Sequence, residues 1–478
     1  MKLTRSVVFA ALVAVMISSC AREIVEEEFA PTESHANYRE ALTRLDIEST
    51  EMGEAWIAAE RSAMERPAAL DPPAAEVVFL DPREPGAVGY RFPVSRGRRV
   101  EIHIDAEHER YFADVFRVPE AEDAEPELVA SSPRGEGLIA FEARSNEYYL
   151  LRLQPELLRG GRFEVRVTTG AALAFPVEEA SAADIWSFFG DDRDGGRRIH
   201  HGVDIFAPRG TPVLATGDAT VTRVGRRDRG GNVIVLRDED RGIMLYYAHL
   251  EEQLVRRGQE VKAGDVIGTV GNTGNARTTP PHLHIGIYQG GWRRPVDPWA
   301  YFIDPPVVDP PAFEHVELLG GWVQVARRVE APAELPRVAI SPVPHTNRNP
   351  FLQGAGDTFD GAEADLQSEP GPPPAPLIAE LAAGTAARVT GASGDLVRVA
   401  TPDGKTGYVD LSVLAVADSL GTEQTLTEAH LLRDPRVGDS FGALEAGARV
   451  TTVGETTRGS LVLLPSGRAA ILEPESGS

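Results

Sequence analysis

The residues most able to do chemistry lie between positions 200 and 284, where five of the eleven histidines of the chain are gathered. They occur in three short motifs, His200-His201-Gly202-Val203-Asp204, Tyr247-Ala248-His249 and His282-Leu283-His284. Side chains alternate between the two faces of a β-strand, so His282 and His284 would share a face while Leu283 points into the opposite layer. Imidazole and carboxylate groups gathered in this way suit a metal site or proton transfer.

A catalytic zinc ion needs about three protein ligands and an open position for water. His200 and Asp204 are separated by a glycine-containing turn and could both reach one ion, and the histidine motif at 282–284 could supply a third ligand. Nitrogen and carboxylate ligands without thiolate favour zinc, although spacing alone leaves other divalent metals open. The chain has no His-Glu-x-x-His sequence. We therefore expect the general base to be a histidine that does not bind the metal.

The segments that must position these histidines read as short strands separated by turn signals, with almost no helical periodicity. The expected strands are residues 213–215, 219–224, 232–236, 243–247, 266–270 and 284–288. Gly230-Gly231 and Gly271-Asn272 mark turns between them. This pattern predicts an all-β, antiparallel domain, which we assign to residues 178–305.

Six motifs in this domain resemble, in the same order and spacing, those of the lysostaphin and LytM-type zinc endopeptidases. They are Arg198-Ile199-His200-His201-Gly202-Val203-Asp204-Ile205, Gly210-Thr211-Pro212-Val213, Tyr247-Ala248-His249-Leu250, Gly264-Asp265-Val266-Ile267-Gly268, Gly271-Asn272-Thr273-Gly274 and Pro281-His282-Leu283-His284. The resemblance implies a small antiparallel β-sheet domain that uses Zn²⁺ to cleave peptide cross-links of bacterial peptidoglycan.

Carried over residue by residue, the resemblance implies that His200, Asp204 and His284 bind the zinc ion. His249 and His282 would be the catalytic pair: one takes a proton from the attacking water, and the other hydrogen-bonds the developing oxyanion or protonates the leaving amine. The resemblance leaves open which histidine does which. His201 would alternate away from the ligands, and we interpret it as non-essential. No tyrosine upstream of His200 matches the one that some members place near the oxyanion, so that role is unassigned.

Two segments precede this domain. Apolar residues recur at helical spacing within residues 36–70, which predicts one or two amphipathic helices. Residues 71–170 change to short alternating runs punctuated by glycine, proline and aspartate, a pattern typical of an antiparallel β-sandwich. His103 and His108 fall in this module, and we interpret both as surface residues.

The N-terminus has the pattern of a bacterial lipoprotein. Basic residues precede an apolar stretch too short to span a bilayer, so residues 1–19 are expected to be a signal peptide that is removed. Ile17-Ser18-Ser19-Cys20 resembles a lipobox, in which Cys20, the only cysteine of the chain, is acylated. Ala21 then resembles lipoproteins sent to the outer membrane, facing the periplasm. The acidic residues 20–35 would form a tether.

Residues 306–375 form an irregular, proline-rich region and linker, and we assign no function to residues 306–366. A faint repeat follows, because Leu381-Ala382-Ala383-Gly384 recurs as Leu444-Glu445-Ala446-Gly447. Residues 376–416 resemble bacterial SH3 domains, and residues 424–474 would be a second, divergent copy. Both are expected to be small β-barrels. Whether they bind the cell wall is left open.

Composition limits the function classes. The chain has 478 residues and 42% hydrophobic content, enough for several domains with buried cores. Its formal net charge of -24 argues against nucleic acid as a partner, because phosphate binding needs concentrated Lys and Arg. Residues 181–300 hold 16 basic and 15 acidic residues, so the acidity resides in the flanks.

Three hypotheses follow for a mainly β protein. The leading one is a lipid-anchored zinc endopeptidase that hydrolyses stem-peptide cross-links of peptidoglycan, at the link between D-alanine and the diamino acid. The second is a catalytically silent regulator that activates cell-wall amidases; such relatives have usually lost ligands, whereas all five residues of the motif set are present here. The third is a structural envelope lipoprotein attached to the wall through its C-terminal modules.

Overall fold

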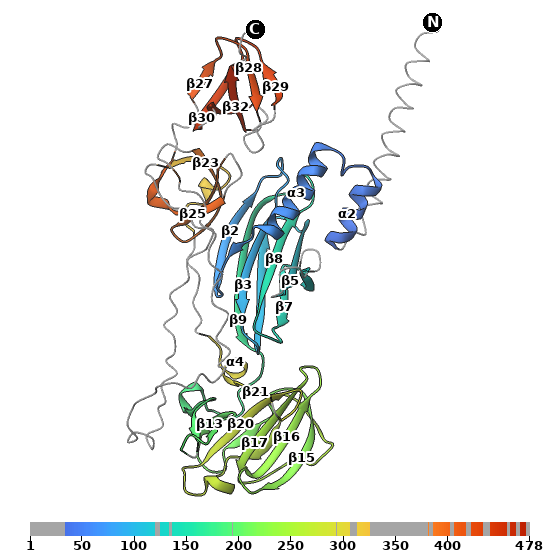
Figure 1. Ribbon diagram of the computed structural model, residues 1–478, viewed down its shortest axis with the longest axis vertical. Helices are drawn as coiled ribbons and strands as arrows, with labels where there is room; N and C mark the ends of the chain where they lie inside the picture. Colours follow the sequence, from blue (N-terminus) through green and yellow to red (C-terminus); the bar gives the residue numbers. More distant parts are fainter. Residues whose placement is uncertain are drawn as a thin grey trace, which may run out of the picture.

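The computed structural model describes residues 34–119, 125–132, 136–193, 195–292, 294–305, 313–325, 381, 386–401, 406–416, 422–433, 440–456, 459–464 and 469–474. Within these ranges the protein is mainly β, and its strands pair antiparallel apart from one short parallel pair, which confirms the expected fold class (Figure 1). The signal peptide, Cys20 and nearly all of the acidic tether lie outside the described residues. No helix within them is long and apolar enough to cross a bilayer.

Two helices open the described chain, α2 (His35–Arg44) and α3 (Glu51–Glu65). Ser34 and Thr50 cap them, each accepting a hydrogen bond from a backbone N–H of the first turn. The apolar faces meet in a small core of Tyr38, Leu42 and Trp56 against Phe112 of the neighbouring sheet. The helices predicted from apolar spacing are therefore present, and they pack on the following module.

A β-sandwich follows. One sheet has the order β1 (Ala68–Ala69), β3 (Val88–Val94), β8 (Glu147–Pro155), β5 (Tyr111–Val118), β6 (Glu127–Ser131). The facing sheet contains β2 (Ala74–Leu80), β9 (Gly161–Ala171), β4 (Arg98–Ala106) and β7 (Leu138–Glu142). Inward-facing side chains of both sheets, among them Tyr90, Phe92, Ile102, Leu151 and Phe163, form one buried core. Of the two histidines in this module, His103 is exposed and His108 is half-buried against the carbonyl oxygen of Gly160.

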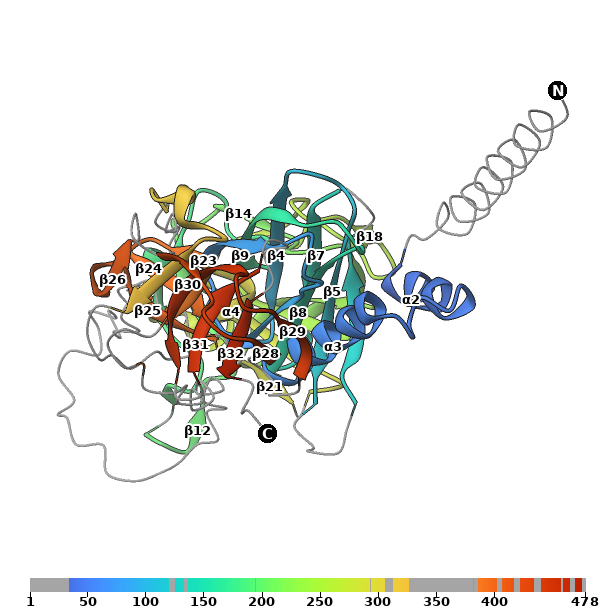
Figure 2. The same cartoon turned by 90° about the horizontal axis from the view of Figure 1, so that it is seen from above.

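The second sheet of the sandwich continues into the C-terminal part of the chain. Strand β2 pairs with β23 (Ala386–Ser393), which pairs in turn with β24 (Leu396–Ala400) and through it with β25 (Thr406–Asp410). Figure 2, which looks along the long axis, shows these strands and the helices α2 and α3 on different sides of the sandwich. The first C-terminal module is thus joined to the sandwich by backbone hydrogen bonds.

The expectation that residues 306–375 are irregular is wrong for one short stretch. Trp322–Val325 forms strand β22, which pairs with β23 and with β26 (Leu414–Val416). Val323 and Val325 are both 1% exposed, because alternate side chains enter the core of the first C-terminal module. This module therefore takes a strand from within the region 306–375.

The second C-terminal module is a six-stranded sheet with its own small core. Its order is β27 (Thr422–Thr425), β30 (Arg449–Thr456), β31 (Gly459–Leu463), β32 (Ala469–Pro474), β28 (His430–Arg433), β29 (Ser440–Leu444). The likeness of the two modules to SH3 domains stays a prediction.

The histidine motifs belong to a separate β-domain, at the lower end of Figure 1. Its main sheet has the order β10 (Ile185–Ser187), β13 (Val203–Phe206), β20 (His282–Gln289), β17 (Ile243–Leu250), β16 (Gly231–Asp238), β15 (Ala219–Arg227), β18 (Glu260–Val261). β21 (Pro295–Val296) extends it beside β20, and β14 (Pro212–Leu214) pairs with β19 (Val266–Thr269). The side chains of this domain pack into one core, which includes Leu283 and Tyr247.

The sandwich and the histidine-bearing domain are held together by polar contacts. Arg241 donates to Glu142 of β7 at 2.5 and 2.9 Å and to Asp238 of β16 at 2.8 Å. Arg98 donates to the carbonyl oxygen of Ile303, just after the short helix α4 (Trp299–Phe302). These side chains are partly shielded from water, so the contacts act in a setting where charges interact more strongly than on an open surface.

Candidate metal centre and active site

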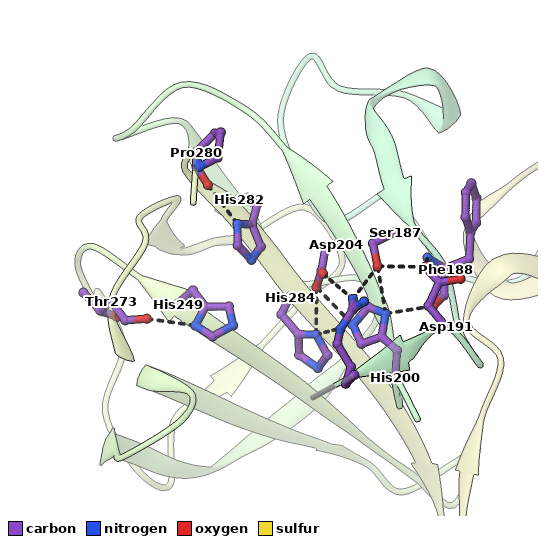
Figure 3. Close-up of polar contacts among 11 residues, drawn as sticks. Ser187, Phe188, Asp191, His200, Asp204, His249, Thr273, Pro280, His282 and His284 are labelled. Atoms are coloured by element: carbon purple, nitrogen blue, oxygen red, sulfur yellow. Dashed lines mark hydrogen bonds and ion pairs between the residues drawn. The ribbon is translucent and has the colours of Figure 1, made fainter. Parts of the chain in front are cut away.

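Three side chains converge at the pairing of β13 with β20. His284 lies opposite Asp204 in the register of the two strands, and His200 is on the segment that leads into β13. Asp204 Oδ1 lies 2.9 Å from His284 Nδ1 and 3.1 Å from His200 Nε2, and the two nitrogens are 2.9 Å apart (Figure 3). The structure therefore brings together the three residues that the sequence proposes as metal ligands.

The three ligand atoms fit a divalent ion such as zinc. Ligands about 2.0–2.1 Å from a tetrahedral ion are separated by roughly 3.3 Å, close to the separations of these atoms. His200 Nδ1 lies 2.8 Å from the carbonyl oxygen of Phe188, which can only accept, so this nitrogen carries the proton and Nε2 keeps its lone pair. Two imidazole nitrogens and a carboxylate oxygen that meet at one point could hold a divalent cation between them.

The electrostatics of the cluster favour an ionised carboxylate. Burial alone would raise the pKa of Asp204, but the charges and hydrogen bonds of His200 and His284 hold that pKa well below its usual value. Burial is the largest cause lowering the pKa of His284. An ionised aspartate and a neutral histidine are the protonation states in which these side chains bind metal.

His249 and His282 lie together beside this cluster, with ring centroids 5.0 Å apart. His249 Nδ1 is 2.9 Å from the carbonyl oxygen of Thr273, and His282 Nδ1 is 2.9 Å from that of Pro280 (Figure 3). Each Nδ1 donates to a backbone oxygen, so each Nε2 is left as the acceptor. Burial, with smaller contributions from His284 and His282, lowers the pKa of His249 to about 4, so its ring is neutral at pH 7. Both rings can therefore accept a proton.

A β-bulge turns His249 into the site. Tyr247 is in the core and Ala248 lines the cavity, so strict alternation would send His249 back into the core. The register between β16 and β17 shifts here, and His249 has a φ of 63°, in the left-handed region. One extra residue changes the alternation, so that both Ala248 and His249 line the cavity while Leu250 returns to the core. The sequence motif alone could not show this change of face.

The five side chains line one open cavity of about 890 Å³. Two tyrosines that sequence reasoning missed, Tyr246 and Tyr288, also line it. Tyr288 shares the face of His284 on β20, and Tyr246 lies edge-on to His284 with ring centroids 5.9 Å apart. Because alternate residues of a strand share a face, the position of Tyr288 four residues after His284 could have indicated that it lies at the site. His201, which alternation places away from the ligands, lines the cavity too, although its non-essential role stays a prediction.

The side chains that line this cavity carry more positive than negative charge. Four arginines line it, namely Arg193, Arg197, Arg198 and Arg229, and Asp204 is the one acidic residue among its lining side chains in the described chain. This contrasts with the formal net charge of -24 of the whole protein. The electrostatic field near the four histidines and the aspartate of the site therefore favours an anionic ligand.

Comparison with known proteins connects this geometry to a family. Residues 198–298 match the model of peptidase family M23. The chain is 40% identical over 109 residues to the DD-carboxypeptidase/endopeptidase Mpg of Neisseria meningitidis serogroup B (strain ATCC 13091 / M2091), a match that covers 23% of this chain and 24% of that protein. It is 41% identical over 128 residues to the L-Ala--D-Glu endopeptidase of Bacillus subtilis (strain 168), covering 25% of this chain and 39% of that protein.

The chain thus spans about a quarter to two fifths of the length of these curated relatives. Among solved structures, the catalytic domain of lysostaphin from Staphylococcus simulans is 34% identical, with 24% of this chain and 85% of that chain covered and a TM-score of 0.22. The family match includes all five residues of the proposed site. Residues 198–298 of the chain are therefore similar to peptidase family M23.

Proposed function

We propose that the protein is a zinc-dependent metalloendopeptidase that hydrolyses peptide cross-links of bacterial peptidoglycan. One observation carries this proposal: three ligand atoms meet within 3.1 Å of one another, and two histidines with acceptor Nε2 atoms line the same cavity. A site for a catalytic metal needs an open side as well as ligands, and the cavity provides it.

The mechanism divides the work among the side chains. His200, Asp204 and His284 would hold a zinc ion, which when bound supplies a Lewis acid that acidifies water and polarises the scissile carbonyl. Either the ring of His249, which is neutral at pH 7, or the ring of His282 accepts the proton of the attacking water at Nε2. The other ring hydrogen-bonds the carbonyl oxygen as it gains charge, or passes a proton to the leaving amine.

The substrate we propose is a stem peptide that carries free carboxylates. Arginines bind carboxylates through paired N–H donors, and three of them line the cavity besides Arg193, which pairs with Asp204. The two relatives are a DD-carboxypeptidase/endopeptidase and an L-Ala--D-Glu endopeptidase. For this chain we propose the directly cross-linked D-alanine to diamino-acid bond, the cross-link expected beneath an outer membrane.

We also propose that the enzyme works from a lipid anchor at Cys20 in the outer membrane, facing the periplasm. The lipobox-like sequence and Ala21 support this placement. A Cys20→Ala variant should lose incorporation of a palmitate analogue during growth and appear in the soluble periplasmic fraction. Unchanged labelling of that variant would refute the anchor without touching the enzymatic proposal.

The activity is tested with a defined dimeric muropeptide cross-linked between D-alanine and the diamino acid. We expect zinc-loaded protein to release two monomers, together heavier than the dimer by one water, and His284→Ala to release none. Mass spectrometry of the products locates the broken bond. A protein that holds stoichiometric zinc yet leaves this dimer and whole sacculi intact would contradict the proposal. A protein that binds no metal but stimulates an added amidase would support the regulator hypothesis instead.

A further inference from the structure

The two oxygens of Asp204 have different partners. Oδ1 faces the two imidazoles, at 2.9 Å from His284 Nδ1 and 3.1 Å from His200 Nε2. Oδ2 accepts a hydrogen bond from Nη2 of Arg193 at 2.9 Å. Only Oδ1 is therefore directed at the point where the ligand atoms meet. The guanidinium contacts the oxygen that faces away from this point, so arginine and metal can be bound to the carboxylate together.

Arg193 is itself held in place. It lies in β11 (Asp192–Arg193), a hairpin partner of β12 (Arg198–Ile199), and its side chain is only 24% exposed. Its Nη2 also donates to the hydroxyl of Ser187. A planar guanidinium fixed by two oxygen acceptors has little freedom to rotate, so the carboxylate that it contacts is restrained as well.

The segment from Ser187 to Arg193 also supports a second ligand. Ser187 Oγ lies 3.2 Å from His200 Nδ1 and donates to Asp191 Oδ2 at 3.0 Å. The backbone N–H of His200 donates to the carbonyl oxygen of Asp191 at 2.8 Å, and that of Gly190 donates to the carbonyl oxygen of His200 at 2.9 Å. One short segment, 187–193, thus contacts two of the three proposed ligands.

We propose that Arg193 is a positioning residue that fixes Asp204 as a one-oxygen metal ligand, with segment 187–193 as its support. Partners behind metal ligands commonly change metal affinity by 10–100-fold because they orient the ligand. The opposite reading is that the positive guanidinium competes with the metal for Asp204. The two readings predict opposite changes in affinity when the arginine is removed. This inference rests on the proposed function only for the identity of the metal.

The test measures zinc affinity by competition with a chromophoric chelator, with no substrate present. Arg193→Gln should bind zinc about 10–100-fold more weakly than the wild type. Arg193→Lys should recover part of this loss, because it keeps the charge but not the planar fork. Arg209→Gln is the matched control: Arg209 pairs with Glu251, a carboxylate that is not a proposed ligand, so zinc affinity should stay within about twofold. Unchanged or tighter binding by Arg193→Gln would overturn the proposal.

Cobalt substitution gives a second measurement, the visible spectrum of bound Co²⁺, which would not change if Arg193 only stabilised the fold. The visible bands of Co²⁺ report the ligand geometry, so we expect Arg193→Gln to alter them while its far-ultraviolet circular dichroism matches the wild type. Identical bands would contradict the proposal. If Arg193→Gln does not fold, Arg193→Lys serves as the test, and we expect it to show a smaller loss of zinc affinity. Wild-type zinc affinity in Arg193→Lys would contradict the proposal. If Arg193→Gln binds zinc more weakly but the wild type cleaves no muropeptide, the proposed function is contradicted while this inference is supported.

Discussion

At the scale of single residues, backbone carbonyl oxygens fix which ring nitrogen three of the four site histidines present. His200, His249 and His282 each direct Nδ1 at a backbone carbonyl and keep Nε2 as acceptor, whereas His284 presents Nδ1 to the ligand cluster. The hydrogen-bond partner therefore fixes the tautomer of each ring. The position of each ring in the sheet decides whether it faces the ligand cluster.

This difference in position predicts distinct phenotypes. His249→Ala and His282→Ala should each lower kcat for muropeptide cleavage by about 10²–10⁴-fold, the usual contribution of acid–base catalysis, while zinc stoichiometry stays unchanged. His284→Ala should lose both the cleavage activity and the bound zinc. Activity assays paired with metal analysis of the same samples check this. Loss of zinc from His249→Ala or His282→Ala would show that the residue binds the metal.

A buried histidine away from the site predicts a pH effect on stability. Burial, with a smaller contribution from Arg152, lowers the pKa of His35 to about 4. The unfolded chain takes up this proton below pH of about 6.5 and the folded chain does not, so stability falls as pH drops from about 6.5 to about 4, by at most about 1.4 kcal/mol per pH unit. His35→Gln, which can still hydrogen-bond Gln154, should flatten this part of the melting-temperature profile. An unchanged profile would contradict the prediction.

How much of the site was predictable differs from residue to residue. His200, Asp204 and His284 could be proposed because their motif spacing is visible in the sequence, and the structure brings them together. Arg193 could not, because its partner Asp204 is reached only through the β11–β12 hairpin. Tyr246 was overlooked because its neighbour Tyr247 belongs to the motif, although Tyr247 points into the core and Tyr246 lines the cavity.

At the scale of elements, the close packing of β13 against β20 sets the position of the ligands. A Cβ on Gly202, which precedes β13, would lie 2.3 Å from the carbonyl oxygen of Ile285 and 2.9 Å from Cε1 of His284. Neither contact can be accommodated without moving a strand. Glycine at this position therefore controls the spacing of the proposed metal ligands.

Gly202→Ala should therefore weaken zinc binding and lower the melting temperature, since β13 and β20 must separate. Gly225→Ala on β15 is the matched control, because a Cβ there meets nothing within 4 Å. Zinc titration and thermal unfolding of both variants check this prediction. Wild-type values for Gly202→Ala would mean that the strands can adjust at no cost.

Element boundaries also show where sequence reasoning failed. The strand expected at 284–288 lies within β20, which the structure extends to His282–Gln289. Strand β22 was missed because it is four residues long and its partners β23 and β26 begin at Ala386 and Leu414, more than 60 residues later in the sequence. A short strand whose partner is distant in sequence leaves almost no local signal.

At the scale of the whole molecule, a buried charge pair joins the sandwich to the first C-terminal module. Glu76 of β2 is 2% exposed, and its Oε1 lies 3.1 Å from Nε of Arg398 in β24, while the hydroxyl of Tyr90 donates to Oε2. Burial raises the pKa of Glu76 even though Arg398 opposes this shift. The pair also lies beside Tyr408, which is 2% exposed.

Removing one partner of this pair should loosen the joint. Arg398→Met leaves the Glu76 carboxyl buried without its cation, a loss of about 3–5 kcal/mol for such pairs. We expect faster hydrogen exchange at the amides of β2 and β23 in this variant. Arg237→Met, which removes the exposed pair with Glu239, should change exchange in its own strand by less than about 1 kcal/mol. Unchanged protection of β23 in Arg398→Met would show that backbone pairing alone holds the module.

The central claim is that one metal ion held by His200, Asp204 and His284 makes this protein a peptidoglycan endopeptidase. The most direct measurement is a zinc titration of chelator-treated protein, with cleavage of the dimeric muropeptide followed by mass spectrometry. We predict no cleavage without metal, and a rate that rises until about one zinc per chain is bound. Cleavage that persists at full rate after chelation, or no cleavage at any zinc concentration, would contradict the account.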